Sequence, residues 1–458
     1  MDIKELNNKK ILLIIPHQDD EIHIAGSLLA SLDNADNVYV LYTTNGDFLF
    51  DAKYRYRECI KSLEKLANID EDKIIFMGYS DQAYDQKTHM YNTFNDWVSN
   101  KGYKETYAPY GFNEWNYLEY GKHCKYNRDN FCNNIKEIIE KYLPEVIICN
   151  DLDFHPDHLM TSLAFERALG LIIRNNPNYK PLVLKTFAYE NSYFGKDDFF
   201  DNKDIPMLFN YDKFGNVISN PYYSKNNAIS LAIDRKCYTK NLFKNKIFKA
   251  ILCHKSQLLV KRTGRIINAN IVYWKRNTNN LLLDANISVS SGNKEYLNDF
   301  MLADTSNVLN GNNKEIIYDK GIWIPDNDDN KKEIDINLDN KKYIYLIRIY
   351  SGRINNKFIK NLEIIYNDKK KEITLENSYI NDIIIDEEIN NLKIFIKDKE
   401  IFNGFSEIEL VNYKEKFEIL EKGNAINKKY NPMVGIINKF TIKILVILQK
   451  IRRKIFIR

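Results

Sequence analysis

The sequence predicts an α/β protein with a Rossmann-like, mainly parallel sheet and flanking helices, followed by a C-terminal β-sandwich and a basic amphipathic tail helix. Three observations support this fold class. Short apolar segments such as 11–15 and 146–149 alternate with helical patterns early in the chain, as in buried parallel strands joined by helices. From about residue 281, short alternating strands are separated by turns, as in a β-sandwich. The last residues mix apolar and basic side chains, as in interfacial helices.

The chain is too long for a single core. At 458 residues it exceeds the size at which one hydrophobic core usually keeps growing. We therefore expect an α/β domain at 1–280, a β-sandwich at 281–413, and a linker with the tail helix at 414–458. The six cysteines form no CxxC pair and no dense cluster, which is typical of free thiols in a reducing compartment.

Charge and hydropathy indicate where the protein acts. The N-terminus carries acids where a signal peptide would be basic, and no segment reaches the ~18 apolar residues of a membrane span. We expect a cytoplasmic protein without a signal peptide, with the inner face of the membrane as a second location. Residues 422–458 hold 10 Lys and Arg and no acid, so the remainder has a net charge of −6 within the total of +4. This distribution excludes a nucleic-acid-binding surface.

The elements of the first domain follow one another regularly. An apolar strand at 11–15 ends at Pro16, and helical spacing begins at Glu21. A long aromatic, turn-rich insertion at 85–130 is expected to act as a lid over substrate, with a packed satellite core as the alternative. We expect the other strands at 38–43, 74–77, 146–149 and 185–190, and the other helices at 55–66, 131–142 and 159–173.

Two predicted strands are each followed, at their carboxyl ends, by histidines and acidic residues. His17 follows the strand at 11–15, and His155 and His158 follow the strand at 146–149. Ligands of open α/β sheets bind outside the carboxyl ends of strands, so neighbouring strands would bring both groups into one cleft. For either motif alone, the alternative is a capped helix with a chance histidine.

Two histidines and one carboxylate with an open position are the usual ligands of hydrolytic zinc. The two motifs would supply His17, Asp20 and His158, and would leave Asp19 and His155 beside the metal. Neither motif contains cysteine, which argues against a closed structural zinc site.

The segment His17-Gln-Asp-Asp-Glu21, together with His155-Pro-Asp-His158, resembles the PIG-L/LmbE family of zinc-dependent N-acetyl sugar deacetylases. The resemblance spans about residues 9–280. It continues in shorter matching segments at 44–47, 57–58, 78–81 and 249–257.

The resemblance implies a role for each site residue. It implies Zn²⁺, with Fe²⁺ as the alternative metal, and makes Asp19 the general base. His155 would stabilise the oxyanion and would be oriented by Asp157. The zinc ligands would be His17, Asp20 and His158.

Three further residues are candidates for substrate binding, and each has an alternative. Arg57 would contact a sugar hydroxyl or phosphate, or else form a surface ion pair on its helix. Asp81 would bind a hydroxyl or cap a turn. Asp153 stands where some family members carry a mobile tyrosine, and Gln18 replaces a common proline.

The predicted reaction removes the N-acetyl group from a GlcNAc-type amino sugar, giving the amine and acetate. The tail suggests a glycan precursor, including a lipid-linked one. The alternatives are an amidase acting on another N-acyl glycoconjugate and a non-catalytic glycan-binding protein. The absence of GxGxxG after the first strand argues against a dinucleotide-binding oxidoreductase.

The C-terminal regions suggest two further partners. Residues 283–412 resemble discoidin-type (F5/8 type C, galactose-binding-like) domains, which implies glycan binding through loops, with packing on the catalytic domain as the alternative. Residues 430–458 would bind an anionic membrane surface, or else form a helix docked on the protein or a disordered end.

Overall fold

The computed structural model divides into two compact units. The domain boundaries predicted at 280 and 413 stay predictions. The first unit comprises 1–162, 181–276 and 418–458, and the second comprises 163–180 and 277–417. The residues described are 3–82, 86–153, 155–188, 228–234, 237, 241–267, 270–309, 316–414 and 432–456.

A seven-stranded mixed sheet forms the centre of the first unit, in the order β3-β2-β1-β4-β5-β7-β6. The first five strands in this order are parallel, and β7 is antiparallel to both β5 and β6. Every residue of β1 is buried, as its unbroken apolar sequence predicts. The strands are β1 (Ile11–Ile15), β2 (Val38–Thr44), β3 (Ile74–Tyr79), β4 (Val146–Asn150), β5 (Leu182–Thr186), β6 (Ala228–Ala232) and β7 (Asn270–Arg276).

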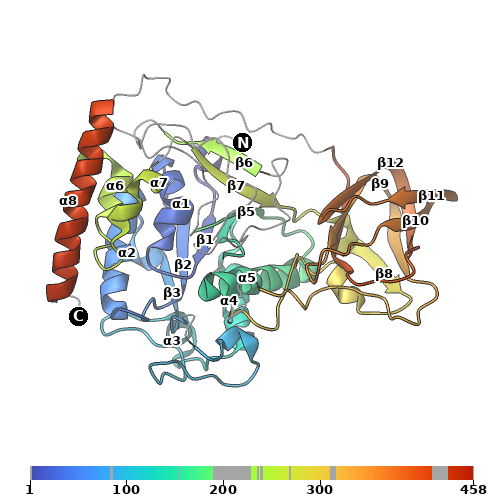
Figure 1. The fold of residues 1–458 in the computed structure, drawn as a ribbon, viewed down its shortest axis with the longest axis horizontal. Helices are drawn as coiled ribbons and strands as arrows, with labels where there is room; N and C mark the ends of the chain where they lie inside the picture. The colour runs from blue at the N-terminus through green and yellow to red at the C-terminus, as the bar shows by residue number, and fades with distance from the viewer. Residues whose placement is uncertain are drawn as a thin grey trace. The chain divides into compact units, whose positions relative to one another are not determined.

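Helices flank this sheet, as Figure 1 shows. Helices α1, α2 and α6 contact one another and form one layer of the core. The Asp51 side chain accepts a hydrogen bond from the Lys53 N–H and caps the start of α2. The helices are α1 (Asp20–Ser31), α2 (Ala52–Ala67), α3 (Trp115–Tyr120), α4 (Arg128–Tyr142), α5 (Pro156–Asn175), α6 (Lys246–Ile251), α7 (Thr263–Ile266) and α8 (Pro432–Phe456).

The strand order reverses between β1 and β4. From β1 the chain continues outward to β2 and β3, whereas from β4 it continues to β5 on the other side. At such a reversal in an open α/β sheet, the helices that follow the two strands diverge, and ligands bind in the crevice at the carboxyl ends of the strands. This is the edge of the sheet to which both His-Asp motifs are attached.

The second unit is built on a six-stranded antiparallel sheet. Its order is β11-β10-β12-β9-β13, and β8 pairs with the first part of β9. Register shifts within the β9–β12 pair bend these long strands, which is how one sheet forms the two layers of a sandwich. The strands are β8 (Ala285–Val289), β9 (Glu333–Ser351), β10 (Asn361–Tyr366), β11 (Lys369–Thr374), β12 (Ile380–Ile396) and β13 (Phe405–Val411).

The predicted fold class is confirmed, including the tail helix α8, which packs Ile442, Leu445 and Val446 against the first core. No helix among the described residues is long and apolar enough to cross a membrane. One predicted element is shifted: the strand expected at 185–190 is β5, which ends at Thr186.

Part of the aromatic insertion is a packed satellite core, and its role as a lid over substrate stays a prediction. Tyr91, Trp97 and Tyr126 are buried in a packed cluster, whereas Tyr110 is 90% exposed.

Candidate metal centre

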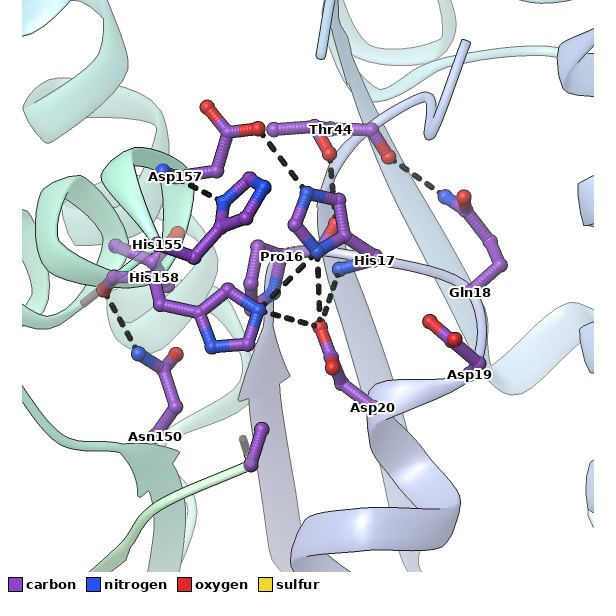
Figure 2. A network of polar contacts seen from close by, with 12 residues as sticks. Pro16, His17, Gln18, Asp19, Asp20, Thr44, Asn150, His155, Asp157 and His158 are labelled. Atoms are coloured by element: carbon purple, nitrogen blue, oxygen red, sulfur yellow. Dashed lines mark hydrogen bonds and ion pairs between the residues drawn. The ribbon is translucent and has the colours of Figure 1, made fainter. Parts of the chain in front are cut away.

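The two sequence motifs meet at the crevice between β1 and β4. His17 follows Pro16 at the end of β1, and His155 and His158 lie at the start of α5, as Figure 2 shows. At the end of β4, the Asn150 side chain donates a hydrogen bond of 2.7 Å to the backbone carbonyl of His158. This bond ties the start of α5 to the sheet.

Three ligand atoms converge at the centre of the site. His17 Nδ1 lies 3.2 Å from His158 Nε2. Asp20 Oδ2 lies 3.2 Å from His17 Nδ1 and 3.3 Å from His158 Nε2. The structure thus brings together the three residues predicted to bind the metal (Figure 2).

The spacing of these three atoms fits a metal ion. A tetrahedral site with bonds of about 2.0–2.2 Å has ligands about 3.3–3.6 Å apart. The three observed separations, 3.2, 3.2 and 3.3 Å, lie at or just below the lower limit of this range. His155 is close to the same space, because His17, His155 and His158 offer ligand atoms within 4.8 Å of one another. We favour Asp20 as the third ligand because its oxygen is nearer to both nitrogens.

The electrostatics of the site also favour a cation. Burial lowers the pKa of His17, but the carboxylates of Asp81, Asp157 and Asp20 raise it more, so that the pKa lies well above its usual value. Burial raises the pKa of Asp20, and the neighbouring His158 and His17 lower it well below its usual value. A site that stabilises positive charge on its imidazoles also attracts a divalent metal.

The Asp157 carboxylate contacts His17, and the Asp157 backbone N–H donates to His155 Nδ1, so Asp157 contacts both rings. Asp157 Oδ2 accepts from His17 Nε2 at 3.0 Å and from the Gln82 N–H at 3.0 Å. Its Oδ1 lies 3.3 Å from His89 Nε2. Asp157 therefore fixes the ring of a candidate metal ligand, as outer-shell carboxylates commonly do.

Asp153 lies behind the other histidine ligand. Its Oδ2 lies 3.2 Å from His158 Nδ1 and accepts from the Ala188 N–H at 3.2 Å. Because Asp153 is only 1% exposed, these contacts make it a positioning residue for His158. This corrects its expected placement beside substrate.

Asp19 is buried and paired with an arginine. As the residue before α1 it makes no capping hydrogen bond, and its Oδ1 accepts from Arg55 Nη2 at 3.0 Å. Arg57 is exposed, because two helical residues place it on the opposite side of α2 from Arg55. The arginine at the site is therefore Arg55, which corrects the prediction of Arg57.

His155 has a defined tautomer. Its Nδ1 accepts a hydrogen bond of 3.3 Å from the backbone N–H of Asp157. The proton of the neutral ring must then reside on Nε2, which makes that atom a donor. The ring packs edge-on against His17, with centroids 4.7 Å apart.

Asp81 lies at the rim of the site, as predicted for a residue near substrate. Its Oδ2 is 3.7 Å from His17 Nε2, and its side chain is 11% exposed. Asp47 holds the backbone of this segment by accepting from the Asp81 N–H at 2.7 Å and from Ser80 Oγ at 2.9 Å.

Sequence reasoning missed Arg55 and His89. Helical spacing could have found Arg55, because it lies four residues before the inward-facing Cys59. His89 lies in a turn-rich segment without periodicity, so the sequence gives no signal for its contact with Asp157. His254 packs beneath the site, where its Nε2 lies 2.6 Å from Glu21 Oε1.

Comparison with known families identifies this domain. Residues 12–169 match the family described as PIG-L, GlcNAc-PI de-N-acetylase. This part of the chain is a PIG-L domain. The matched residues contain both His-Asp motifs and Arg55. No curated protein matches the chain.

The chain is also similar to solved structures of carbohydrate-binding modules. A family 32 module from Clostridium perfringens NanJ, in complex with galactose, is 19% identical with a TM-score of 0.20, covering 28% of this chain and 94% of that module. The family 32 module of Streptococcus pneumoniae EndoD is 10% identical with a TM-score of 0.22, covering 29% and 99%. A fucose-binding module from S. pneumoniae is 17% identical with a TM-score of 0.23, covering 30% and 98%.

Proposed function

We propose that the PIG-L domain is a metal-dependent hydrolase that removes the N-acetyl group from a GlcNAc-type amino sugar. The observation that carries this proposal is the convergence of His17 Nδ1, His158 Nε2 and Asp20 Oδ2 at the crevice between β1 and β4. The family match supports an N-acetylated sugar as substrate.

The metal would be held by His17, Asp20 and His158, with zinc as the proposed ion and Fe²⁺ as the alternative. A divalent ion at this place lowers the pKa of a water molecule and polarises the amide carbonyl. Asp157 and Asp153 orient the two imidazoles from behind, so that His17 presents Nδ1 and His158 presents Nε2.

Asp19 would act as the general base. It accepts a proton from the attacking water on its carboxylate and later delivers it to the nitrogen of the leaving amine. Arg55 fixes the position of the Asp19 carboxylate, because its Nη2 lies 3.0 Å from Asp19 Oδ1. The products are acetate and the protonated amine, so the water supplies one oxygen of acetate, and both of its protons pass to the amine nitrogen.

His155 would stabilise the oxyanion of the tetrahedral intermediate. Because its Nδ1 already accepts from the backbone, its Nε2–H is the donor available to a substrate oxygen. Asp81, at the rim of the site, would accept a hydrogen bond from a sugar hydroxyl. An amidase acting on another N-acyl glycoconjugate would use the same residues, so a substrate panel separates the two functions.

We also propose that α8 binds an anionic membrane surface from the cytoplasmic side. The helix carries six basic residues and no acid. Its outer face exposes an apolar stripe at helical spacing, opposite the side packed on the core. These properties are typical of interfacial helices. The stripe consists of Ile436, Ile437, Phe440, Ile444, Ile447, Leu448 and Ile451.

Glycan binding by the second unit is a separate proposal, which rests on its resemblance to discoidin-type domains.

Acetate release from free, nucleotide-linked and lipid-linked GlcNAc tests the hydrolase. Asp19→Asn should lower kcat by about 10²–10⁴-fold and leave zinc content unchanged, because Asp19 is not a predicted ligand. Chelation should abolish the wild-type activity, and added zinc should restore it. Full activity of Asp19→Asn, or of metal-free protein, would refute the mechanism.

A further inference from the structure

A large pocket lies within the first unit, beside the candidate metal centre. Its volume is about 1480 Å³, which is more than a single sugar needs. Four parts of the chain line it: the start of α2 with the residues before it, the aromatic insertion around residues 101–110, Leu258, and the end of α8. The α8 wall lies outside residues 12–169, the part of the chain that matches the PIG-L family.

The wall of this pocket is strongly basic. It contains five cationic side chains and two acids. Asp51 is occupied as the cap of α2, and Asp47 accepts hydrogen bonds from Ser80, the Asp81 backbone and Tyr107. The cations are therefore in excess. They are Lys53, Lys101, Lys450, Arg453 and Lys454.

Aromatic rings hold several of these cations in place. The Arg453 guanidinium lies 4.7 Å from the centre of the Phe50 ring, and Lys53 Nζ lies 5.3 Å from the centre of the Tyr110 ring. Such contacts orient a cation and leave its charge available. Glu58 on α2 accepts from the backbone N–H and hydroxyl of Ser256 and also attracts Arg453 electrostatically, so it offsets part of the positive charge and leaves the cations in excess.

Two segments link the wall of the pocket to the metal centre, although no candidate ligand lines the pocket itself. Asp47 lines the pocket and holds the backbone of Asp81, whose carboxylate is 3.7 Å from His17 Nε2. Helix α2 also connects the two places, because Ala52 lines the pocket and Arg55 binds Asp19 one turn later. A substrate could therefore place its acetamido group at the metal centre and another group in the pocket.

We propose that this pocket binds a phosphate or diphosphate group carried by the amino-sugar substrate. The inference rests on the proposed function and names the substrate class. A phosphoryl group carries several acceptor oxygens and up to two charges, which matches a guanidinium and several ammonium groups. A neutral aglycone would leave these cations without a counter-charge. Sugar nucleotides and lipid-linked sugar diphosphates both carry this group.

Direct binding of inorganic pyrophosphate tests the pocket without requiring activity. In calorimetric titrations of the full chain, Arg453→Gln should weaken binding by about 10–100-fold, the usual effect of removing a charged hydrogen-bond partner. Arg452→Gln is the matched control, since Arg452 is the neighbouring arginine on α8 and does not line the pocket. It should change affinity by less than about threefold. Equal effects of the two variants, or no effect of either, would overturn the proposal.

Kinetics then identify the source of the phosphate. Two substrates are compared: UDP-GlcNAc in solution and a polyprenyl diphosphate-linked GlcNAc in vesicles. For both, Arg453→Gln should raise KM and leave kcat unchanged. The substrate whose KM rises more is the one whose phosphate the pocket binds better. A neutral methyl glycoside of GlcNAc should be insensitive. If none of these substrates releases acetate but pyrophosphate binding depends on Arg453, the proposed hydrolase function is refuted and the proposal of a phosphate-binding pocket is supported. If all substrates react with a KM that Arg453→Gln does not change, the pocket proposal fails and the hydrolase stands.

Discussion

Asp157→Asn is the sharpest test of how the metal centre is built. The substitution preserves size and shape and removes only the charge and one acceptor. Asp157 Oδ2 faces two donors, His17 Nε2 and the Gln82 N–H, and Oδ1 faces His89 Nε2. His89 Nδ1 accepts from the Tyr91 N–H, so its Nε2 must carry the proton and be a donor as well.

An asparagine amide at position 157 cannot satisfy all three donors. Whichever way it is turned, its NH₂ group faces at least one N–H in a fully buried place. An unsatisfied buried donor costs about 1–3 kcal/mol. Loss of the partner of a ligand histidine typically lowers metal affinity by 10–100-fold. We therefore expect Asp157→Asn to lose both stability and zinc affinity.

Two measurements check this expectation. Competition with a chromophoric chelator gives the zinc affinity, and thermal unfolding of chelated protein gives the stability without metal. Asp96→Asn is the control, because Asp96 is an exposed carboxylate whose partner is Lys125 and which has no contact with the candidate ligands. It should change zinc affinity by less than about threefold. Wild-type zinc affinity in Asp157→Asn would refute the view that Asp157 orients His17.

Two other predictions concern parts of the chain outside the metal centre. Gly170→Ala should destabilise the second unit by about 1–3 kcal/mol, because an added Cβ would lie 2.0 Å from the Asp299 carbonyl oxygen; unchanged urea unfolding of that unit would contradict this packing. The double variant Phe440→Asp/Ile447→Asp should remove binding to anionic vesicles in flotation, since burying each side chain contributes about 1.5–3 kcal/mol. Leu118→Asp, at an exposed apolar position on α3, should float like the wild type, and flotation of the double variant would exclude α8 as the membrane contact.

Local sequence patterns were sufficient to predict most of the parallel strands of the first unit. The apolar segment 11–15 is β1, and the segment that begins at 146 is β4, because only a strand covered on both faces is apolar throughout. The insertion at 85–130 could not be divided in advance, since its aromatic residues lack a period that separates buried from exposed positions. Only packing shows that Tyr126 is buried and Tyr110 is exposed.

The sequence was sufficient to predict the candidate metal ligands, but not the residues that contact them. His17, Asp20 and His158 could be named because each follows a strand end, and neighbouring strands bring their carboxyl ends together. Their outer partners could not, because hydrogen-bond geometry depends on side-chain directions that no spacing encodes. Asp157 was expected to orient His155; its backbone N–H does contact that ring, but its carboxylate contacts His17. Arg55 occupies the place expected for Arg57.

By itself, the sequence determined the strands β1 to β4, the helices α2, α4 and α5, and the kinds of side chain at the sheet edge, because these depend on local periodicity and on residue chemistry. The strands β6 and β7 were not predicted. The tertiary structure alone decided which carboxylate supports which histidine, and that α8 brings Arg453 and Lys454 to a pocket beside residues some 400 positions earlier. Contacts of such separation depend on how whole elements pack, and a linear pattern carries no record of that packing.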